Sequence, residues 1–166
     1  MRIFGLAGWS GSGKTTLMMA LIPEFVSRGL TVSTIKHAHH SFDIDQPGKD
    51  SWHHRHAGAQ EVMVASGRRW ALMHELRGGP EPSLDELLVR MTPVDLLLVE
   101  GFKHHDHPKI EVYRRALAKP LLHPDDPFIV AIASEQQLAE FCRPWLPLSD
   151  AAAIANFIIG HEAGIV

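Results

Sequence analysis

Disulfides and membrane spans are both excluded by what this chain lacks. It contains one cysteine among 166 residues, Cys142, so no internal disulfide framework can form. A lone cysteine is typical of proteins in a reducing compartment, and we expect a cytoplasmic location. No apolar run reaches the roughly 18 residues that a membrane-spanning helix needs. The first expected strand follows Met1 and Arg2 directly, so we expect no signal peptide.

The chain also lacks an excess of positive charge. Its 16 lysine and arginine residues stand against 19 aspartate and glutamate residues, which gives a net charge of −3 and an isoelectric point near 6.4. Domains that bind nucleic acid are usually basic, so we expect no nucleic-acid partner. Hydrophobic residues make up 45% of the chain, which is enough for a core. Because no repeat or linker divides the sequence, we predict a single domain over residues 1–166.

Residues 8–15 have the sequence Gly-Trp-Ser-Gly-Ser-Gly-Lys-Thr, which matches the phosphate-loop pattern G-x-x-x-x-G-K-[ST]. The glycines let the backbone curl so that successive N–H groups point inward at a polyphosphate. Lys14 can then reach the β- and γ-phosphates, and the Thr15 hydroxyl can bind Mg²⁺. The N-terminus of the following helix adds positive potential at the same place. The pattern therefore predicts a site for a nucleoside triphosphate.

Apolar runs alternate with helical patterns along the chain, which is typical of an α/β fold with a mostly parallel sheet. Strands are expected over residues 3–7, 31–36, 62–66, 70–74, 94–99, 110–113 and 128–133. Helices are expected over residues 16–28, 51–59, 83–90, 136–141 and 151–159. The spacing of the strands at 62–66 and 70–74 suits a hairpin, so we expect a mixed central sheet. The predicted fold is a three-layer phosphate-loop NTPase fold with helices on both faces of that sheet.

A triphosphate site of this type also needs an acidic residue that holds Mg²⁺ directly or through water. Glu100 follows the apolar strand expected over residues 94–99, and the carboxyl end of such a strand faces the crevice where these folds bind ligands. We therefore predict Glu100 as a metal-binding residue. Asp43 and Asp45 follow the strand at 31–36 and could also approach the metal. The predicted metal set is Thr15, Glu100 and Asp45.

The chain is rich in histidine, with 12 residues that gather in three clusters. The clusters are His37, His39 and His40; His53, His54 and His56; and His104, His105 and His107. Two of them directly follow expected strands, where a histidine could contact phosphate with a charge that varies near neutral pH. Solvated loop histidines are the alternative interpretation. A zinc site is a third one, although the paired cysteines typical of structural zinc are missing.

Five stretches of the chain recur together in one known family. The first is the phosphate loop at residues 9–16, which many nucleotide-binding proteins share. The others are Ile-Lys-His-Ala-His-His at 35–40, Asp-Ile-Asp-Gln-Pro-Gly-Lys-Asp-Ser at 43–51, Arg-Trp-Ala-Leu-Met at 69–73 and Leu-Val-Glu-Gly-Phe-Lys at 98–103. With these stretches the chain resembles the molybdopterin-guanine dinucleotide biosynthesis adaptor family, MobB. The resemblance covers nearly the whole chain and is strongest up to Tyr113.

The resemblance implies a homodimeric GTP-binding adaptor with weak GTPase activity that acts in molybdenum cofactor maturation. It implies association with the guanylyltransferase that attaches GMP to molybdopterin. By position it assigns phosphate binding to Ser10, Gly11, Ser12, Gly13, Lys14, Thr15 and Thr16. It implies a Mg²⁺ role for Thr15 and Glu100. Segments 36–40 and 43–50 would border the nucleotide, or molybdopterin and its guanine dinucleotide.

Three points remain open at the level of sequence. No N-K-x-D motif for guanine recognition is present, so the choice of GTP follows from the resemblance alone. Ser134 and Glu135 follow a late strand and are residues from which a base could be recognised. A small-molecule kinase is the alternative function, with Arg68–Arg69 or Arg114–Arg115 as candidates to neutralise the transferred phosphoryl group. A metal chaperone is a third possibility and depends on the histidines. An exposed edge of the hairpin would favour pairing into a dimer.

Overall fold

The computed structural model describes residues 1–38, 42–103 and 105–161. Its described residues fall into two compact units, one built from residues 1–37 and from residue 91 onward, the other from residues 38–90. The division was not anticipated from the sequence, and a single domain over 1–166 stays a prediction. In the described part of the chain no helix has the length and apolar character needed to cross a membrane.

The first unit contains a six-stranded sheet with the order β2-β5-β1-β6-β7-β8. The strands are β1 (Arg2–Ala7), β2 (Val32–Lys36), β5 (Leu96–Glu100), β6 (Lys109–Tyr113), β7 (Ile129–Ser134) and β8 (Trp145–Pro147). All neighbouring strands in it are parallel. The expectation of a mixed central sheet is therefore wrong, because the antiparallel hairpin forms a separate two-stranded sheet in the other unit. The mostly parallel α/β organisation itself is confirmed.

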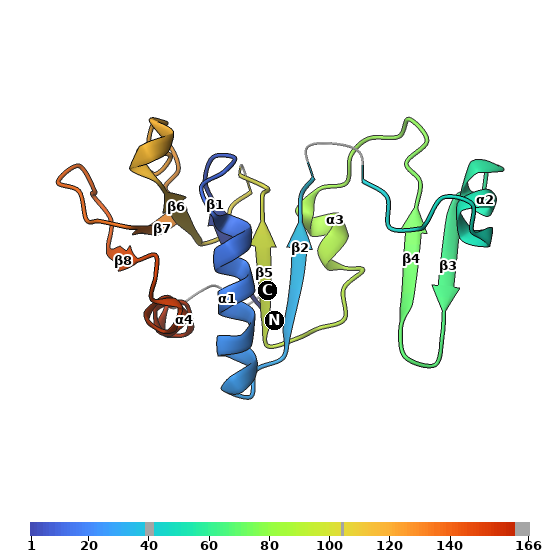
Figure 1. Ribbon diagram of the computed structural model, residues 1–166, viewed down its shortest axis with the longest axis horizontal. Helices are drawn as coiled ribbons and strands as arrows, with labels where there is room; N and C mark the ends of the chain where they lie inside the picture. The colour runs from blue at the N-terminus through green and yellow to red at the C-terminus, as the bar shows by residue number, and fades with distance from the viewer. Residues whose placement is uncertain (39–41, 104, 162–166) are drawn as a thin grey trace. The chain divides into compact units, whose positions relative to one another are not determined.

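Two helices of this unit, α1 (Lys14–Ser27) and α4 (Ala151–Gly160), pack against each other and on one face of the sheet (Figure 1). Alternate residues of β1, β5 and β6 point to that face, because side chains of a strand alternate between its two sides. The core there includes Leu6, Leu98, Ile110, Leu21 and Ile154, each at most 1% exposed. The helix–sheet packing therefore holds the start of α1 at the carboxyl end of β1.

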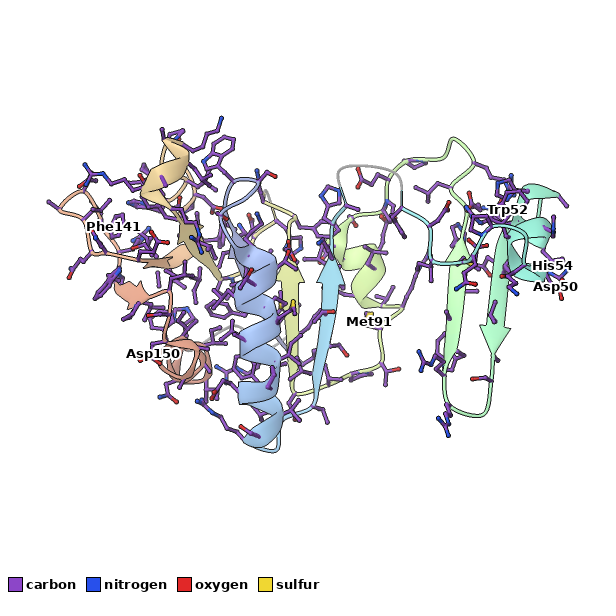
Figure 2. All side chains as sticks on the ribbon, viewed as in Figure 1. Asp50, Trp52, His54, Met91, Phe141 and Asp150 are labelled. Atoms are coloured by element: carbon purple, nitrogen blue, oxygen red, sulfur yellow. The ribbon has the colours of Figure 1, made fainter. Side chains whose placement is uncertain are left out.

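Local signals set the limits of the helices in the first unit. α1 continues through Pro23, and the chain leaves it at Gly29, which has a φ of +81° that suits glycine. Asp150 is the N-cap of α4, as its position predicts, and its carboxylate accepts from the Ala153 N–H at 2.9 Å (Figure 2). A short 3₁₀ turn, Arg115–Leu117, follows β6.

The second unit contains α2 (Asp50–His56), β3 (Glu61–Ala65), β4 (Trp70–His74) and α3 (Leu84–Leu88). Strands β3 and β4 form the expected antiparallel hairpin, with Met63 opposite Leu72. Helix α3 begins at the capping box that its sequence predicts: the Ser83 hydroxyl accepts from the Glu86 N–H, and the Glu86 carboxylate accepts from the Ser83 N–H.

The segment after β7 differs from the sequence-based expectation. Residues 136–141 form bends and a turn in place of the predicted helix. The Ser134 hydroxyl donates to the Gln136 carbonyl oxygen at 2.6 Å, which removes an acceptor that a helix would use. Strand β8 was not predicted, since it is three residues long and contains Pro147, which is tolerated because β8 is an edge strand.

Candidate functional site

The phosphate loop connects β1 to α1 at the carboxyl edge of the sheet. Gly8 has a φ of +146°, and a Cβ atom there would lie 2.6 Å from the Val112 carbonyl oxygen, so only glycine allows the loop to lie this close to β6. Gly13, with a φ of +98°, is the N-cap of α1, and no side chain in the described residues caps that helix. The amide N–H groups of the first turn therefore have no side-chain acceptor, which suits an anion.

The Lys14 ammonium is folded back onto this loop. Its Nζ donates to the carbonyl oxygens of Gly8 at 2.9 Å and of Trp9 at 3.0 Å. Burial lowers the pKa of Lys14; the carboxylate of Glu100 opposes this change, while the like charges of Lys103 and Lys36 lower the pKa further. Several positive groups thus act on one another at the loop, with one carboxylate among them.

Glu100, at the end of β5, lies next to Thr15 in the first turn of α1. The Thr15 hydroxyl is 3.1 and 3.3 Å from the two oxygens of the Glu100 carboxylate, and the Lys36 Nζ is 3.8 Å from the nearer one. The Glu100 side chain is half-buried at 12% exposure. Hydroxyl and carboxylate oxygens are the hard ligands that Mg²⁺ prefers. The structure therefore brings together two of the three residues of the predicted metal set.

Asp45, the third residue of the predicted metal set, belongs to the second unit and is bound to an arginine. The Arg55 guanidinium donates from Nη2 and Nε to the two carboxylate oxygens of Asp45 at 2.7 and 3.3 Å. The same guanidinium contacts Asp43 at 2.8 Å and Glu75 at 3.3 Å. Arg55 comes from α2, where Figure 2 labels the neighbouring side chains Trp52 and His54. The metal role of Asp45 stays a prediction, and in this structure its carboxylate is an arginine ligand.

Arg114, which follows β6, is a contact of the phosphate loop that sequence reasoning did not identify as such. Its Nε donates to the Ser12 carbonyl oxygen at 3.0 Å, and its Nη1 donates to the Glu135 carboxylate at 2.7 Å. A Cβ atom at Gly13 would lie 3.4 Å from the guanidinium. The signal that could have indicated it is a basic residue directly after a buried strand, at the edge where parallel strands end.

Comparisons with known proteins show the family to which the chain belongs. The model of the family described as "Molybdopterin guanine dinucleotide synthesis protein B", MobB, matches residues 3–135. The chain belongs to the MobB family. It is 44% identical over 159 residues to the molybdopterin-guanine dinucleotide biosynthesis adapter protein of Haemophilus influenzae, a match that covers 94% of this chain and 86% of the relative. It is 41% identical over 160 residues to the Escherichia coli protein of the same name, covering 95% and 91%.

Solved MobB structures share the fold of this MobB-family chain. A MobB protein homolog from Bacillus stearothermophilus has a TM-score of 0.71 at 24% identity, and the match covers 96% of both chains. A crystal structure of molybdopterin-guanine biosynthesis protein B has a TM-score of 0.73 at 25% identity, covering 95% of this chain and 97% of the other. The predicted phosphate-loop α/β fold is therefore confirmed.

The structure describes part of each of two histidine clusters of this MobB-family chain and all of the third. His39, His40 and His104 lie outside the described residues. Among the residues that are described, no group of three histidine, cysteine, aspartate or glutamate side chains is placed to hold a metal ion. The His37 ring packs against Phe102 with ring centres 4.9 Å apart. The His37 backbone N–H donates to the Glu100 backbone carbonyl oxygen. The backbone of His37 is therefore paired with that of Glu100, the candidate metal-binding residue.

His107 is buried just before β6, with 3% of its surface exposed. Its Nδ1 lies 3.1 Å from Nδ1 of His105, and its Nε2 has no partner among the described residues. Burial lowers the pKa of His107 to about 4; the charges of Lys109 and His105 act in the same direction, and Asp126 opposes them. The folded protein therefore holds this imidazole neutral over a pH range in which the unfolded chain would protonate it.

His107 should make the free energy of unfolding depend on pH. His107 has a pKa of about 4 in the folded chain and of 6.5 in the unfolded chain, so the unfolded chain takes up the proton first as the pH falls. The stability that the neutral His107 contributes to the fold is therefore fully present above pH 6.5 and is lost as the pH falls towards 4. His107→Gln should flatten this dependence, measured by urea unfolding above, within and below that range. His54→Gln, on exposed His54 of α2, is the control and should leave it intact. Equal pH slopes for H107Q and the wild type would contradict the assignment.

Proposed function

We propose that this chain is a GTP-binding adaptor that assists the guanylyltransferase in molybdopterin-guanine dinucleotide biosynthesis and that hydrolyses GTP slowly. The adapter role in that biosynthesis is supported by family membership and by relatives of 41–44% identity that are named for it. GTP, Mg²⁺ and the transferase as partner form the finer part of the proposal. They are argued from the site as follows.

The observation that supports the nucleotide proposal is that the loop contains hydrogen-bonding groups without partners in the protein. The N-terminus of α1 is uncapped, and Ser12 has a buried hydroxyl, 1% exposed, with no partner among the described residues. Lys14 donates to two backbone carbonyls that a phosphate oxygen could replace. Buried polar groups without partners destabilise a fold, so the Ser12 hydroxyl, together with the uncapped helix N-terminus, supports a polyphosphate ligand. Phosphate binding is proposed for residues 10–16.

Thr15 and Glu100 are proposed to hold Mg²⁺, which supplies charge neutralisation at the phosphates when bound. The two side chains already share a hydrogen bond, so their oxygens are close enough to serve one ion. The Lys36 ammonium lies 3.8 Å from the Glu100 carboxylate and adds positive charge beside the proposed metal position. In this arrangement Lys14 and the amide groups of α1 orient the triphosphate, while Thr15 and Glu100 orient the metal.

Slow hydrolysis is expected because the arginine that contacts the phosphate loop is already engaged in hydrogen bonds within the protein. Arg114 is the one arginine in the described residues that contacts the loop, and it is bound to the Ser12 carbonyl and to Glu135. Arg68 and Arg69 lie at the turn of the β3–β4 hairpin, in the other unit. A kinase would need a free arginine at the transferred phosphate, so the engagement of Arg114 favours an adaptor over the alternative of a small-molecule kinase.

Guanine selection is proposed at the carboxyl end of β7. Ser134 is buried, and its hydroxyl is occupied by the Gln136 carbonyl and by the Trp145 indole N–H. Glu135 is exposed and carries a carboxylate that could accept from the adjacent N–H groups of guanine. Its ion pair with Arg114 links this position to the phosphate loop. This leaves Glu135 as the better candidate of the two for contact with the base.

Lys14→Ala should weaken GTP binding by at least about tenfold, because it removes a charged hydrogen-bond donor to the phosphates. Calorimetric titration with GTP measures the affinity, and circular dichroism checks the fold. When the wild-type chain is added to guanylyltransferase, molybdopterin and GTP, it should increase formation of the guanine dinucleotide. The Lys14→Ala variant should not. Arg143→Gln, which removes an exposed charge, is the matched control. Unchanged GTP affinity in folded K14A would overturn the nucleotide site.

Turnover of GTP by the purified chain should be about 10⁻⁴ to 10⁻³ per second with Mg²⁺, the range of phosphate-loop GTPases that lack a supplied arginine. Glu100→Gln should lower this rate with Mg²⁺ and should leave GTP binding without metal nearly unchanged. A steady-state phosphate-release assay with and without the metal measures both effects. Turnover of several per second would point to a self-sufficient enzyme, and equal losses with and without Mg²⁺ would indicate a structural role for Glu100.

A homodimer is proposed from the family resemblance and from the exposed hairpin. Met63, Trp70 and Leu72 are 61%, 66% and 44% exposed, and Met63 and Leu72 stand opposite each other on one face. Side chains of a strand that are two residues apart share a face, so Trp70 extends this apolar surface. Exposed apolar strands of this kind are a template for pairing with a second copy.

The chain should therefore have a solution mass of about twice 18.4 kDa at micromolar concentration. Leu72→Lys should shift the equilibrium towards the monomer, because a charge at the centre of an apolar contact must be desolvated. Arg69→Lys, at the turn of the same hairpin, should leave the mass unchanged. Light scattering coupled to size exclusion measures all three proteins. A wild-type mass near 18.4 kDa would contradict the dimer.

A further inference from the structure

Trp9 occupies an unusual position for an aromatic residue, directly after the first glycine of the phosphate loop. Its indole N–H donates to the Pro120 carbonyl oxygen at 2.8 Å, which fixes the orientation of the ring. Its own carbonyl oxygen accepts from the Lys14 ammonium at 3.0 Å. The ring is therefore anchored beside the lysine that is expected to meet the β- and γ-phosphates.

Two lysine side chains place their charges over this ring. The Lys103 Nζ lies 5.0 Å and the Lys119 Nζ 5.7 Å from the centre of the Trp9 indole. Both distances are within the range of cation–π attraction, which holds an ammonium group without neutralising it. Lys103 follows β5 and Lys119 follows β6, so the loops after three neighbouring strands meet at Trp9.

Neither ammonium is paired with a carboxylate in the part of the chain that the structure describes. Other lysines of the unit are paired: Lys36 lies near Glu100, and buried Lys109 pairs with Asp126 at 2.9 Å. The charge of Lys103 also lowers the pKa of Lys14. Positive charge therefore exceeds negative charge at the entrance of the loop.

Buried contacts hold both lysine-bearing loops in place. The Lys109 ammonium donates to the Lys103 carbonyl oxygen at 3.0 Å from a position that is 1% exposed. The equally buried Glu111 accepts from the N–H groups of Leu122 and His123, at 2.7 and 3.0 Å, and so anchors the segment that contains Lys119. The two charges thus lie on preorganised backbone, which reduces the entropy lost when an anion binds.

We propose that Lys103 and Lys119, held over Trp9, form a subsite for the terminal phosphate of a nucleoside triphosphate. The subsite distinguishes triphosphate from diphosphate, because the extra phosphate brings negative charge next to two unneutralised ammonium groups. It rests on the proposed function, and it assigns a role to residues outside the glycine-rich motif. The inference concerns affinity for the anion and requires no chemical step.

The test compares binding of GTP and GDP to Lys103→Gln, Lys119→Gln and the double variant, each with Mg²⁺. The wild type should prefer GTP. Each single change should reduce the GTP-to-GDP affinity ratio by about tenfold, the effect of one charged hydrogen bond, while GDP affinity changes little. Lysine-to-arginine changes at both positions should restore most of the preference, because they keep the charge. Arg143→Gln controls for net charge alone.

Changes at Trp9 separate the ring from the charges. Trp9→Phe keeps an aromatic face and should retain most of the GTP preference, whereas Trp9→Leu should lose it to the same extent as the lysine variants. Circular dichroism and urea unfolding establish that each variant is folded. A ratio in the folded double variant equal to that of the wild type would overturn the subsite. So would equal losses of GTP and GDP affinity, which would indicate a general structural effect.

Inorganic tripolyphosphate and pyrophosphate are the second pair of probes, since they have the phosphates without base or sugar. If the wild type binds tripolyphosphate with a preference that the lysine changes remove, but does not bind GTP, the subsite stands and the GTP proposal fails. If GTP binds and Lys14→Ala abolishes binding while the lysine changes have no effect, the GTP proposal stands and the subsite fails. A wild type that binds none of these anions overturns both.

Discussion

The parallel pairing of β1 with β5 on one side and β6 on the other is the constraint on which the candidate site depends. Parallel strands end at the same edge of a sheet, so the loops after these three strands must meet. The pairing of Leu6 with both Glu100 and Ile110 sets how far each neighbour extends beside β1. As a result the phosphate loop receives Glu100 from β5 and Arg114 from the segment after β6.

Closely packed backbone makes this arrangement rigid. Gly8 lies against the Val112 carbonyl oxygen, and Gly101 lies against the His37 side chain, where a Cβ atom would be 2.5 Å from that of the histidine. Neither approach tolerates a side chain at the glycine. Strand β6 adds buried charges on its other face, where Lys109 and Glu111 are each 1% exposed and hydrogen-bonded to neighbouring loops. Buried charges with full partners define loop positions more sharply than apolar contacts do.

Charge is arranged in opposite ways in the two units. In the first, Lys14, Lys36, Lys103 and Lys119 lie around the phosphate loop together with the Glu100 carboxylate. In the second, Arg55 alone holds Asp43, Asp45 and Glu75. The positive charges gathered around the phosphate loop suit a polyphosphate ligand. In the second, the carboxylates stabilise the fold around one guanidinium.

Much of the fold could be predicted because it depends on local sequence. Several features act within a few residues of one another: the glycine spacing of the loop, the apolar run before Glu100, the capping residues Ser83 and Asp150, and the hairpin spacing. The predicted helix at 136–141 and the missed strand β8 were errors, because both segments are short and their structure is decided by partners outside them. For example, the Pro144 carbonyl oxygen accepts from the Ile132 N–H of β7. The mixed sheet was wrong because hairpin spacing does not specify which sheet a hairpin joins.

The sequence by itself determined the family, the α/β class and the presence of a phosphate loop, because the spacing of residues within one segment encodes each of them. Only the tertiary structure decided which distant residues meet that loop. Three examples are contacts between different segments of the chain: Arg114 at Ser12, the two lysines over Trp9 and, in the other unit, Arg55 at Asp45. Such contacts follow from strand order and side-chain packing, which no single segment of the sequence specifies.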